Sequence, residues 1–302
     1  MLTSSPESDL RSRFLQLRSM PFAAPLDDNA LLLLSEHARY RRFKKGEALA
    51  RSGRPIESMF VLVSGQVTAT AHGHHLTTAG KNSAVGVTAL LSRDPDGVTA
   101  IADEETEAIE LPGEALFAAY REDFSLVRNV LRLQCRAILG RRNSLPTSTD
   151  DENPSPGTWR DGELTVVERV LRIRGSDTFA NANLDAVFAL ARRSEEVRLE
   201  PGEALWRRGD PSLFWYQIEY GLVRCENAEG QQSVIGGKYA LGIMDCWAES
   251  NRSYDAYAET AVIAQRTSLE AMLDVLETHH DLAMGIVAVV SRTNMNAAFL
   301  AS

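Results

Sequence analysis

Three histidines lie close together in the segment AHGHHL and form the densest group of side chains that could do chemistry. The imidazole nitrogens of His72, His74 and His75 could bind a transition metal. A complete site would need further ligands, but no glutamate follows within the next ten residues and the next histidine is His279. Histidines around a glycine are more typical of a solvated hairpin turn. We therefore expect no metal site here.

The cysteines offer no second kind of chemistry. Cys135, Cys225 and Cys246 are odd in number, widely spaced and without a C-x-x-C pair, which favours reduced thiols over disulfides or a zinc site. No arrangement of nucleophile, base and acid emerges along the chain, and the glycine fingerprints of triphosphate-binding and dinucleotide-binding enzymes are missing. We expect a cytoplasmic protein that is not an enzyme and holds no cofactor.

Charge and hydropathy exclude two classes of partner. The chain has 32 Lys and Arg against 41 Asp and Glu, a formal net charge of -9, whereas phosphate-dominated binding of nucleic acid needs local positive charge. The N-terminal residues lack the apolar core of a secretory signal, and no apolar run approaches the roughly 18 residues that span a bilayer. We expect a protein that binds neither nucleic acid nor membranes.

The sequence pattern alternates along the chain between segments typical of helices and segments typical of strands. Residues 1–25 are predicted as an N-terminal helical extension, and residues 26–42 as a second helix that begins at capping aspartates. Glycines recur between short apolar runs over residues 43–110, which is typical of closely spaced strands and tight turns. A helical period then returns up to about residue 142.

A break in composition separates two halves of the chain. Residues 143–163 combine prolines, glycines and an acidic triplet, which predicts a flexible linker, with Trp159 as its one large apolar side chain. The last helix, from about Asp281, is apolar on more sides than a lone helix needs. It should therefore cover the second half of the chain or pair with a second copy, which would give a homodimer.

An internal repeat decides the architecture. When the chain is shifted by 156 residues, the segment GEAL at 46–49 falls on GEAL at 202–205, Gly65 falls on Gly221 and Gly86 falls on Gly242, without gaps. Glycines that recur in register indicate turns with positive φ or close backbone approach. A period this long indicates a duplicated domain, not a solenoid.

Both copies resemble a known family. The segments FKKGEALARSGRPIESMFVLVSGQV and LEPGEALWRRGDPSLFWYQIEYGLV are similar to the opening of a cyclic nucleotide-binding domain. The resemblance implies an α+β, mainly β fold, with two tandem double-stranded β-helix (jelly-roll) domains, each flanked by helices, at 26–142 and 164–302. In that family a cassette of a short helix and an arginine holds the cyclic phosphate, and a glutamate holds the ribose.

The first copy departs from the cassette pattern. Its segment VGVTALLSRDPDGVTAIA keeps Gly86, but Val87 stands where the family has the ribose-binding glutamate. Asp96, followed by Gly97, stands where the resemblance implies the phosphate-binding arginine, so repulsion replaces attraction. We expect this copy to be degenerate and unable to bind a nucleotide.

The second copy keeps half of the cassette. In LGIMDCWAESNRSYDAYA the resemblance places Gly242 on the cassette glycine and Arg252, followed by Ser253, on the phosphate arginine. Ile243 replaces the glutamate, and Asp245 replaces a small alanine and would compete for the donors that a phosphate needs. Arg252 is either an intramolecular ion-pair residue or an anion-binding residue. The candidate ligand-binding residues are Gly242, Ile243, Met244, Asp245, Arg252 and Ser253.

Three functions follow from these observations, in order of preference. The first is a non-catalytic regulatory or adaptor protein that acts through a protein partner. The alternative is a sensor that binds cAMP or cGMP in the second domain through Arg252. The third is a cupin-like metalloenzyme that uses the histidines of residues 72–75. A DNA-reading module like that of the catabolite activators is not expected, because nothing basic follows Arg292.

Overall fold

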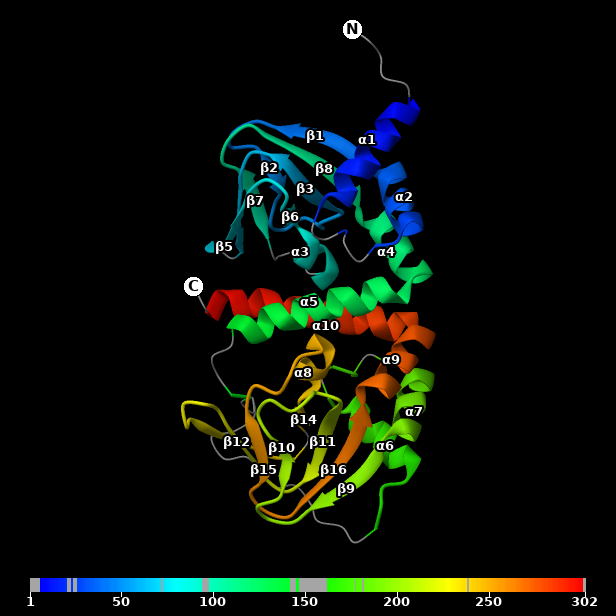
Figure 1. Cartoon of the computed structure of the whole chain (residues 1–302), viewed down its shortest axis with the longest axis vertical. Helices are drawn as coiled ribbons and strands as arrows, with labels where there is room; N and C mark the ends of the chain where they lie inside the picture. The colour runs from blue at the N-terminus through cyan, green and yellow to red at the C-terminus, as the bar shows by residue number, and fades with distance from the viewer. Residues whose placement is uncertain are drawn as a thin grey trace. The chain divides into compact units, whose positions relative to one another are not determined.

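Two compact units make up the structure, which is a computed structural model. It describes residues 6–20, 23, 26–71, 73–93, 98–141, 145–146, 162–176, 178–180, 182–237 and 239–300. The first unit comprises Met1–Val130 and Val287–Ser302, and the second comprises Leu131–Ile286. Each unit is built around one β-roll with helices along one side (Figure 1).

The first roll consists of two antiparallel sheets. Their strand orders are β1-β8-β3-β6 and β2-β7-β4-β5. The strands are β1 (Arg39–Phe43), β2 (Ala48–Ala50), β3 (Ser58–Ser64), β4 (Val67–Ala71), β5 (His74–Ala79), β6 (Ala84–Val85), β7 (Thr99–Ala102) and β8 (Thr106–Pro112). Its helices are α1 (Pro6–Arg18), α2 (Asp28–His37), α3 (Val87–Ser92) and α4 (Gly113–Glu122). In β4 the sequence VTATA alternates between buried and half-buried residues, as a strand with one inward face requires.

The second roll repeats the first. Its sheet orders are β14-β11-β16-β9 and β10-β15-β12-β13. The strands are β9 (Glu195–Leu199), β10 (Ala204–Trp206), β11 (Phe214–Tyr220), β12 (Val223–Glu226), β13 (Gln232–Ile235), β14 (Ala240–Leu241), β15 (Asp255–Ala258) and β16 (Val262–Ser268). The helices are α6 (Val166–Arg174), α7 (Leu184–Arg193), α8 (Ile243–Ala248) and α9 (Leu269–Thr278).

The repeat extends to strand register. Phe60 pairs with Val85 in the first roll, and Tyr216 pairs with Leu241 in the second. Each residue of the second pair follows its equivalent in the first pair by 156 residues. The irregularity between Leu62 and Ser64 recurs between Ile218 and Tyr220. The predicted fold of two tandem jelly-roll domains flanked by helices is confirmed.

One predicted helix end was wrong. The helix predicted over residues 26–42 ends at His37, and Arg39–Phe43 forms strand β1, which pairs with β8. Sheet pairing overrides the local helical pattern there. Helices α1 and α6 occupy the same place in the repeat. Arg13 donates to the carbonyl of Ala38 as Arg169 donates to that of Ser194, again at a shift of 156 residues.

The predicted linker is partly structured. Residues 145–146 pack on the second roll, where Ser233 Oγ donates to the carbonyl of Pro146 at 2.8 Å and Leu145 contacts the roll interior. Residues 147–161, including Trp159, lie outside the described residues. The two long helices, α5 (Phe124–Arg141) and α10 (His280–Leu300), each contribute to both compact units.

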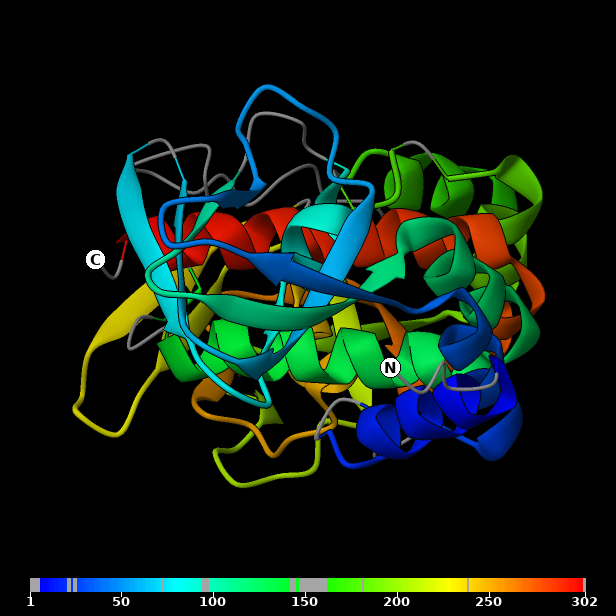
Figure 2. The ribbon, with the colours of Figure 1, turned by 90° about the horizontal axis from the view of Figure 1, so that it is seen from above.

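The last helix does not cover only the second roll. From Val287 onwards α10, the red helix of Figure 2, belongs to the first unit. Met295 joins the interior of the first roll. Ile286, Val287 and Val290 of this helix are buried, and the expected dimer stays a prediction.

The described residues hold no group of three or more potential metal ligands. His72 lies outside them, and His74 and His75 are exposed on β5. The three cysteines are buried, and burial raises the pKa of Cys225 and Cys246 to about 12, which keeps both thiols protonated at neutral pH. None of the described helices has both the length and the hydropathy needed to cross a bilayer.

Candidate functional site

The cassette of the second roll begins at a turn that needs glycine. Gly242 follows β14 with a φ of 77° and precedes α8. A Cβ atom here would collide with the guanidinium of Arg252, so the turn and the arginine fit together only because residue 242 has no side chain. The predicted cassette glycine and cassette arginine are thus brought into direct contact.

Arg252 is buried, with 3% of its surface exposed. Its Nη1 atom donates to the carbonyl of Gly242 at 3.1 Å, and its Nη2 atom donates to the carbonyl of Phe214 at the start of β11. The backbone N–H of Arg252 donates to the carbonyl of Asp210 at 2.9 Å. Both terminal nitrogens of the guanidinium therefore donate to backbone carbonyls of this chain.

An aromatic group supports the same guanidinium. The Cζ atom of Arg252 lies 4.0 Å from the centroid of the Trp206 ring, a close cation–π contact. Trp206 Nε1 donates to the carbonyl of Tyr254 at 3.0 Å. The rings of Tyr216 and Tyr254 each lie 5.6 Å from the Trp206 ring, and all three side chains belong to the core of the roll. Aromatic side chains of the roll itself thus fill the interior beneath the cassette.

Asp245 supplies the opposite charge. It is 3% exposed, and its Oδ2 atom lies 3.8 Å from Nη1 of Arg252. Burial raises the pKa of the Asp245 carboxyl above its ordinary value, and the positive charge of Arg252 opposes this shift. The carboxylate occupies the position that Ala89 holds in the first copy. An intramolecular ion pair therefore forms where the resemblance implies a phosphate.

The other predicted residues are distributed around this cluster. Ile243 is buried at the start of α8, and Ser253 is exposed. Met244 accepts a weak hydrogen bond from Cys135 on α5, with a sulfur–sulfur distance of 3.8 Å. Only Gly242, Asp245 and Arg252 meet at one point. Sequence reasoning missed Trp206, although its position within GEALW, where the first copy has Ala50, was a visible difference.

The first cassette has the same backbone and different contents. Gly86 has a φ of 91° and begins α3, with half-buried Val87 as its first residue. Asp96 and Gly97 lie outside the described residues. Arg93, which follows α3, is exposed, with its guanidinium 5.8 Å from the ring of Phe117. It points its charge to a helix surface and not to the cassette.

Each cassette helix is capped by an arginine at an equivalent position of the repeat. In the second unit, Arg136 Nε donates to the carbonyl of Ala248 at 2.8 Å, at the end of α8. In the first unit, Arg292 Nη1 donates to the carbonyl of Ser92 at 2.9 Å, at the end of α3. Both bonds satisfy carbonyls that a helix end leaves open.

Comparison with known proteins gives a family for part of the chain. Residues 40–123 match the model of the cyclic nucleotide-binding domain. No match was found among curated proteins.

Solved structures are similar over most of the chain or over one part of it. The regulatory subunit of a cAMP-independent protein kinase A from Trypanosoma brucei is 16% identical over 92% of this chain and 91% of that chain, with a TM-score of 0.37. The regulatory domain of Toxoplasma gondii PKA with cAMP is 14% identical over 92% and 96%, with a TM-score of 0.37. The N-terminal domain of a transcriptional regulator from Streptomyces coelicolor is 21% identical over 40% and 90%, with a TM-score of 0.37.

At these identities and TM-scores, the likeness to solved structures says nothing about what this chain binds. The family match concerns the first roll, and the second roll repeats its strand order and register. The resemblance predicted from the sequence is confirmed: the chain carries a domain of the cyclic nucleotide-binding family over residues 40–123.

Proposed function

We propose that this chain is a non-catalytic regulatory protein whose two cyclic nucleotide-binding-like domains act through contacts with a protein partner and do not respond to a cyclic nucleotide. The observation that carries the proposal is the state of Arg252. Its Nη1 and Nη2 atoms donate to the carbonyls of Gly242 and Phe214, its charge faces Asp245, and its flat surface covers Trp206, while its Nε has no hydrogen-bond partner among the described residues. A cyclic phosphate would have to displace these partners.

The first roll supports the same proposal. Val87 cannot accept a hydrogen bond from a ribose hydroxyl, and the interior next to α3 is occupied by Met295 together with Val85 and Ala89. The first domain then serves as a framework. Regulation is exerted by surfaces of the protein and not by a ligand inside its rolls.

The competing function is a sensor in which a cyclic nucleotide binds the second cassette. One observation favours it, namely that Arg252 lies at the cassette turn beside Gly242 and faces a single acidic partner, Asp245, among the described ion pairs. In a sensor, the incoming phosphate would replace the Asp245 carboxylate as the partner of Arg252.

Calorimetric titration separates the two functions. The full chain is titrated with cAMP and with cGMP up to about 1 mM, beside the variants Asp245→Ala and Arg252→Lys. We expect no binding by the wild type. Asp245→Ala restores the alanine of the first copy and frees the guanidinium, so weak binding by this variant alone would identify the carboxylate as the block.

Micromolar binding by the wild type would overturn the proposal. If that binding fell at least tenfold in Arg252→Lys, which keeps the charge but loses the planar fork, the second domain would be a sensor. Far-ultraviolet circular dichroism of each variant verifies that the rolls remain folded.

A further inference from the structure

Two neighbouring helices of the second unit carry large apolar side chains at their surface. On α6, Val167 and Leu171 are 65% and 66% exposed, and on α7, Leu184 and Phe188 are 56% and 43% exposed. Each pair is spaced by four residues, so its members adjoin on one side of their helix. The two helices pack against each other along the outside of the unit (Figure 1).

The equivalent positions of the first copy have a different character. Val167 and Leu184 correspond to Arg11 and Asp28, which are charged, while Leu171 and Phe188 correspond to Leu15 and Leu32. The exposed apolar surface is thus larger in the second copy, by two positions at which the first copy is charged. A scattered exposed leucine needs no explanation, but an enlarged group on paired helices does.

The charge of the helix pair also changes between the copies. Helices α6 and α7 carry five arginines against two carboxylates, whereas α1 and α2 carry three arginines against four carboxylates. Arg174, Arg192 and Arg193 occupy the last turns of α6 and α7 and are exposed. The chain as a whole has a net charge of -9, whereas this pair of helices has a net positive charge. We call Val167, Leu171, Leu184 and Phe188, with these three arginines, the α6–α7 face.

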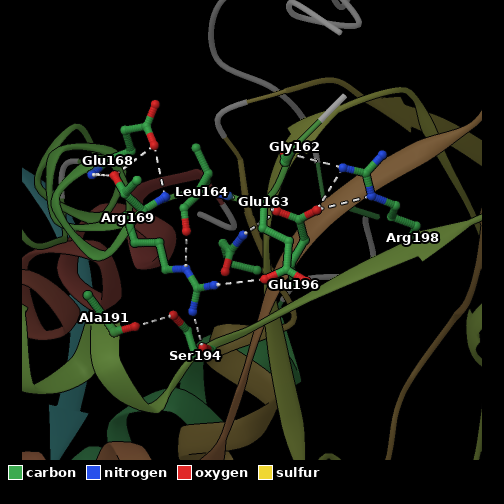
Figure 3. Close-up of polar contacts among 11 residues, drawn as sticks. Gly162, Glu163, Leu164, Glu168, Arg169, Ala191, Ser194, Glu196 and Arg198 are labelled. Atoms are coloured by element: carbon green, nitrogen blue, oxygen red, sulfur yellow. Dashed lines mark hydrogen bonds and ion pairs between the residues drawn. The ribbon is translucent and has the colours of Figure 1, made fainter. Parts of the chain in front are cut away.

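The α6–α7 face is held in place by the polar contacts beneath it. Thr165 and Glu168 form a reciprocal capping box at the start of α6. Arg169 donates to the carbonyl of Leu164 at 3.1 Å and to that of Ser194 at 2.6 Å, which ties α6 to the residue after α7 (Figure 3). The buried Glu196 carboxylate accepts from the backbone N–H of Leu164 at 3.2 Å. A fixed surface loses little conformational entropy on binding.

One arginine of the face already covers an apolar neighbour. The Cζ atom of Arg192 lies 6.0 Å from the centroid of the Phe188 ring, so positive charge borders the apolar residues directly. A partner that buried Phe188 would bring its own groups next to this guanidinium. Carboxylates there would gain charge-assisted hydrogen bonds, while lysines or arginines would be repelled.

We propose that the α6–α7 face binds an acidic, amphipathic segment of a partner protein. Its leucine or aromatic side chains would cover Leu171 and Phe188, and its carboxylates would meet Arg174, Arg192 and Arg193. A helix that lays its apolar side on such a surface is a recurring mode of recognition. This inference rests on the proposed function, because it names the surface and the chemistry through which a regulatory protein would contact its partner.

Selection from a library of random 16-residue peptides displayed on phage tests the proposal. The full chain is the bait, and enriched peptides are synthesised and titrated by fluorescence anisotropy. The test variant is Leu171→Ser/Phe188→Ser. The matched control is Leu15→Ser/Leu32→Ser, which changes the equivalent positions of the first copy. We expect enriched peptides to be acidic, with Leu, Phe or Trp at helical spacing, and to bind the test variant at least tenfold more weakly but the control unchanged.

A second variant, Arg174→Glu/Arg193→Glu, isolates the contribution of charge. It should weaken the same peptides and reduce the dependence of their Kd on salt concentration. Because all substituted side chains are exposed, circular dichroism should show that every variant is folded.

Several results would overturn the inference. These are no enrichment, enriched peptides that are not acidic, or equal binding to the test variant. Sedimentation with phosphatidylserine vesicles that the test variant loses would assign the face to an anionic lipid surface. A dimer that the test variant loses would assign it to a second copy. Peptides that bind elsewhere would leave the proposed function standing, whereas micromolar binding of cAMP or cGMP would overturn that function without testing this face.

Discussion

In the first roll, the outer face of the sheet β1-β8-β3-β6 is apolar, whereas the same face of the second roll is polar. Met59, Val61, Ile109 and Leu111 of the first copy correspond to Trp215, Gln217, Gln265 and Thr267 of the second. All eight side chains are buried, with at most 2% exposed. Within the described residues, Gln217 Oε1, Gln265 Oε1 and Thr267 Oγ1 have no hydrogen-bond partner.

The interior next to the cassette is likewise more polar in the second roll than in the first. The second roll buries Arg252 and Asp245, while the first holds Ala89 at the position of Asp245. Buried polar groups cost free energy unless their partners are well placed. The comparison shows one backbone supported in two ways, by apolar packing in the first copy and by polar contacts in the second. The second copy should therefore be the more easily perturbed.

The largest effect is expected from removing the buried arginine. Arg252→Ala leaves the Asp245 carboxylate buried without its cationic partner and removes one donor from each of two backbone carbonyls. The free energy of unfolding of the second unit should fall by about 3–5 kcal/mol. Chemical denaturation followed by tryptophan fluorescence measures this, because the described tryptophans, Trp206, Trp215 and Trp247, all lie in the second unit.

A matched control for this variant lies in the first copy. Arg93 follows the equivalent cassette helix but is exposed, so Arg93→Ala should change stability by less than about 1 kcal/mol. If both substitutions had equally small effects, the Arg252 cluster would not be a structural element of the second roll.

A smaller effect is expected from exchanging one residue between the outer faces. Val61→Gln places an amide in an apolar layer and should destabilise the first roll by about 2–4 kcal/mol. The reverse exchange, Gln217→Val, removes a buried oxygen that has no partner among the described residues. It should leave the second roll within about 1 kcal/mol of the wild type or stabilise it.

Native-state hydrogen exchange of the β3 and β11 amides reads the two rolls separately. A Gln217→Val variant that lost protection in β11 as strongly as Val61→Gln lost it in β3 would contradict the contrast between the faces. The polar face would then be a satisfied network instead of a source of instability.

The smallest effect concerns pH. Because burial raises the pKa of Asp245 in the folded state, the folded protein holds this proton more tightly than the unfolded chain. The contribution of the protonated Asp245 to the free energy of unfolding is fully present below the ordinary pKa, 3.8, and is lost as pH rises through the raised pKa. The stability of the wild type relative to Asp245→Asn should therefore decline as pH rises from below 3.8. Fluorescence-detected unfolding at a series of pH values measures it, and a relative gain with rising pH would contradict it.

Much of the architecture could be predicted from glycines and apolar spacing. Gly86 and Gly242 marked both cassette turns, because only a residue without Cβ fits a positive φ next to packed atoms. The position of Arg252 followed from the resemblance to the family's cassette, since the repeat places Asp96 there. The participation of α1 in the repeat was missed, although Arg13 and Arg169 are in register and bond equivalent carbonyls.

The contacts of the site could not be predicted in the same way. Trp206 and Arg252 are far apart in sequence and meet only because β10 and β15 pair. Whether an arginine binds a ligand or a backbone carbonyl depends on such tertiary contacts. The extent of β1 could not be predicted for a related reason, since its partner β8 is the last strand of the roll in sequence.

The capping contact of Arg292 has a consequence for the order of events during synthesis. Arg292 and Ser92 are 200 residues apart in the chain, so the first roll leaves the ribosome long before the helix that completes it. At about 5–20 residues per second, this delay is roughly 10–40 s. During that interval, Val85 and Ala89 lack Met295 as a neighbour. The domain that is made first is therefore finished last, and the nascent chain must protect an incomplete core while its second half is translated.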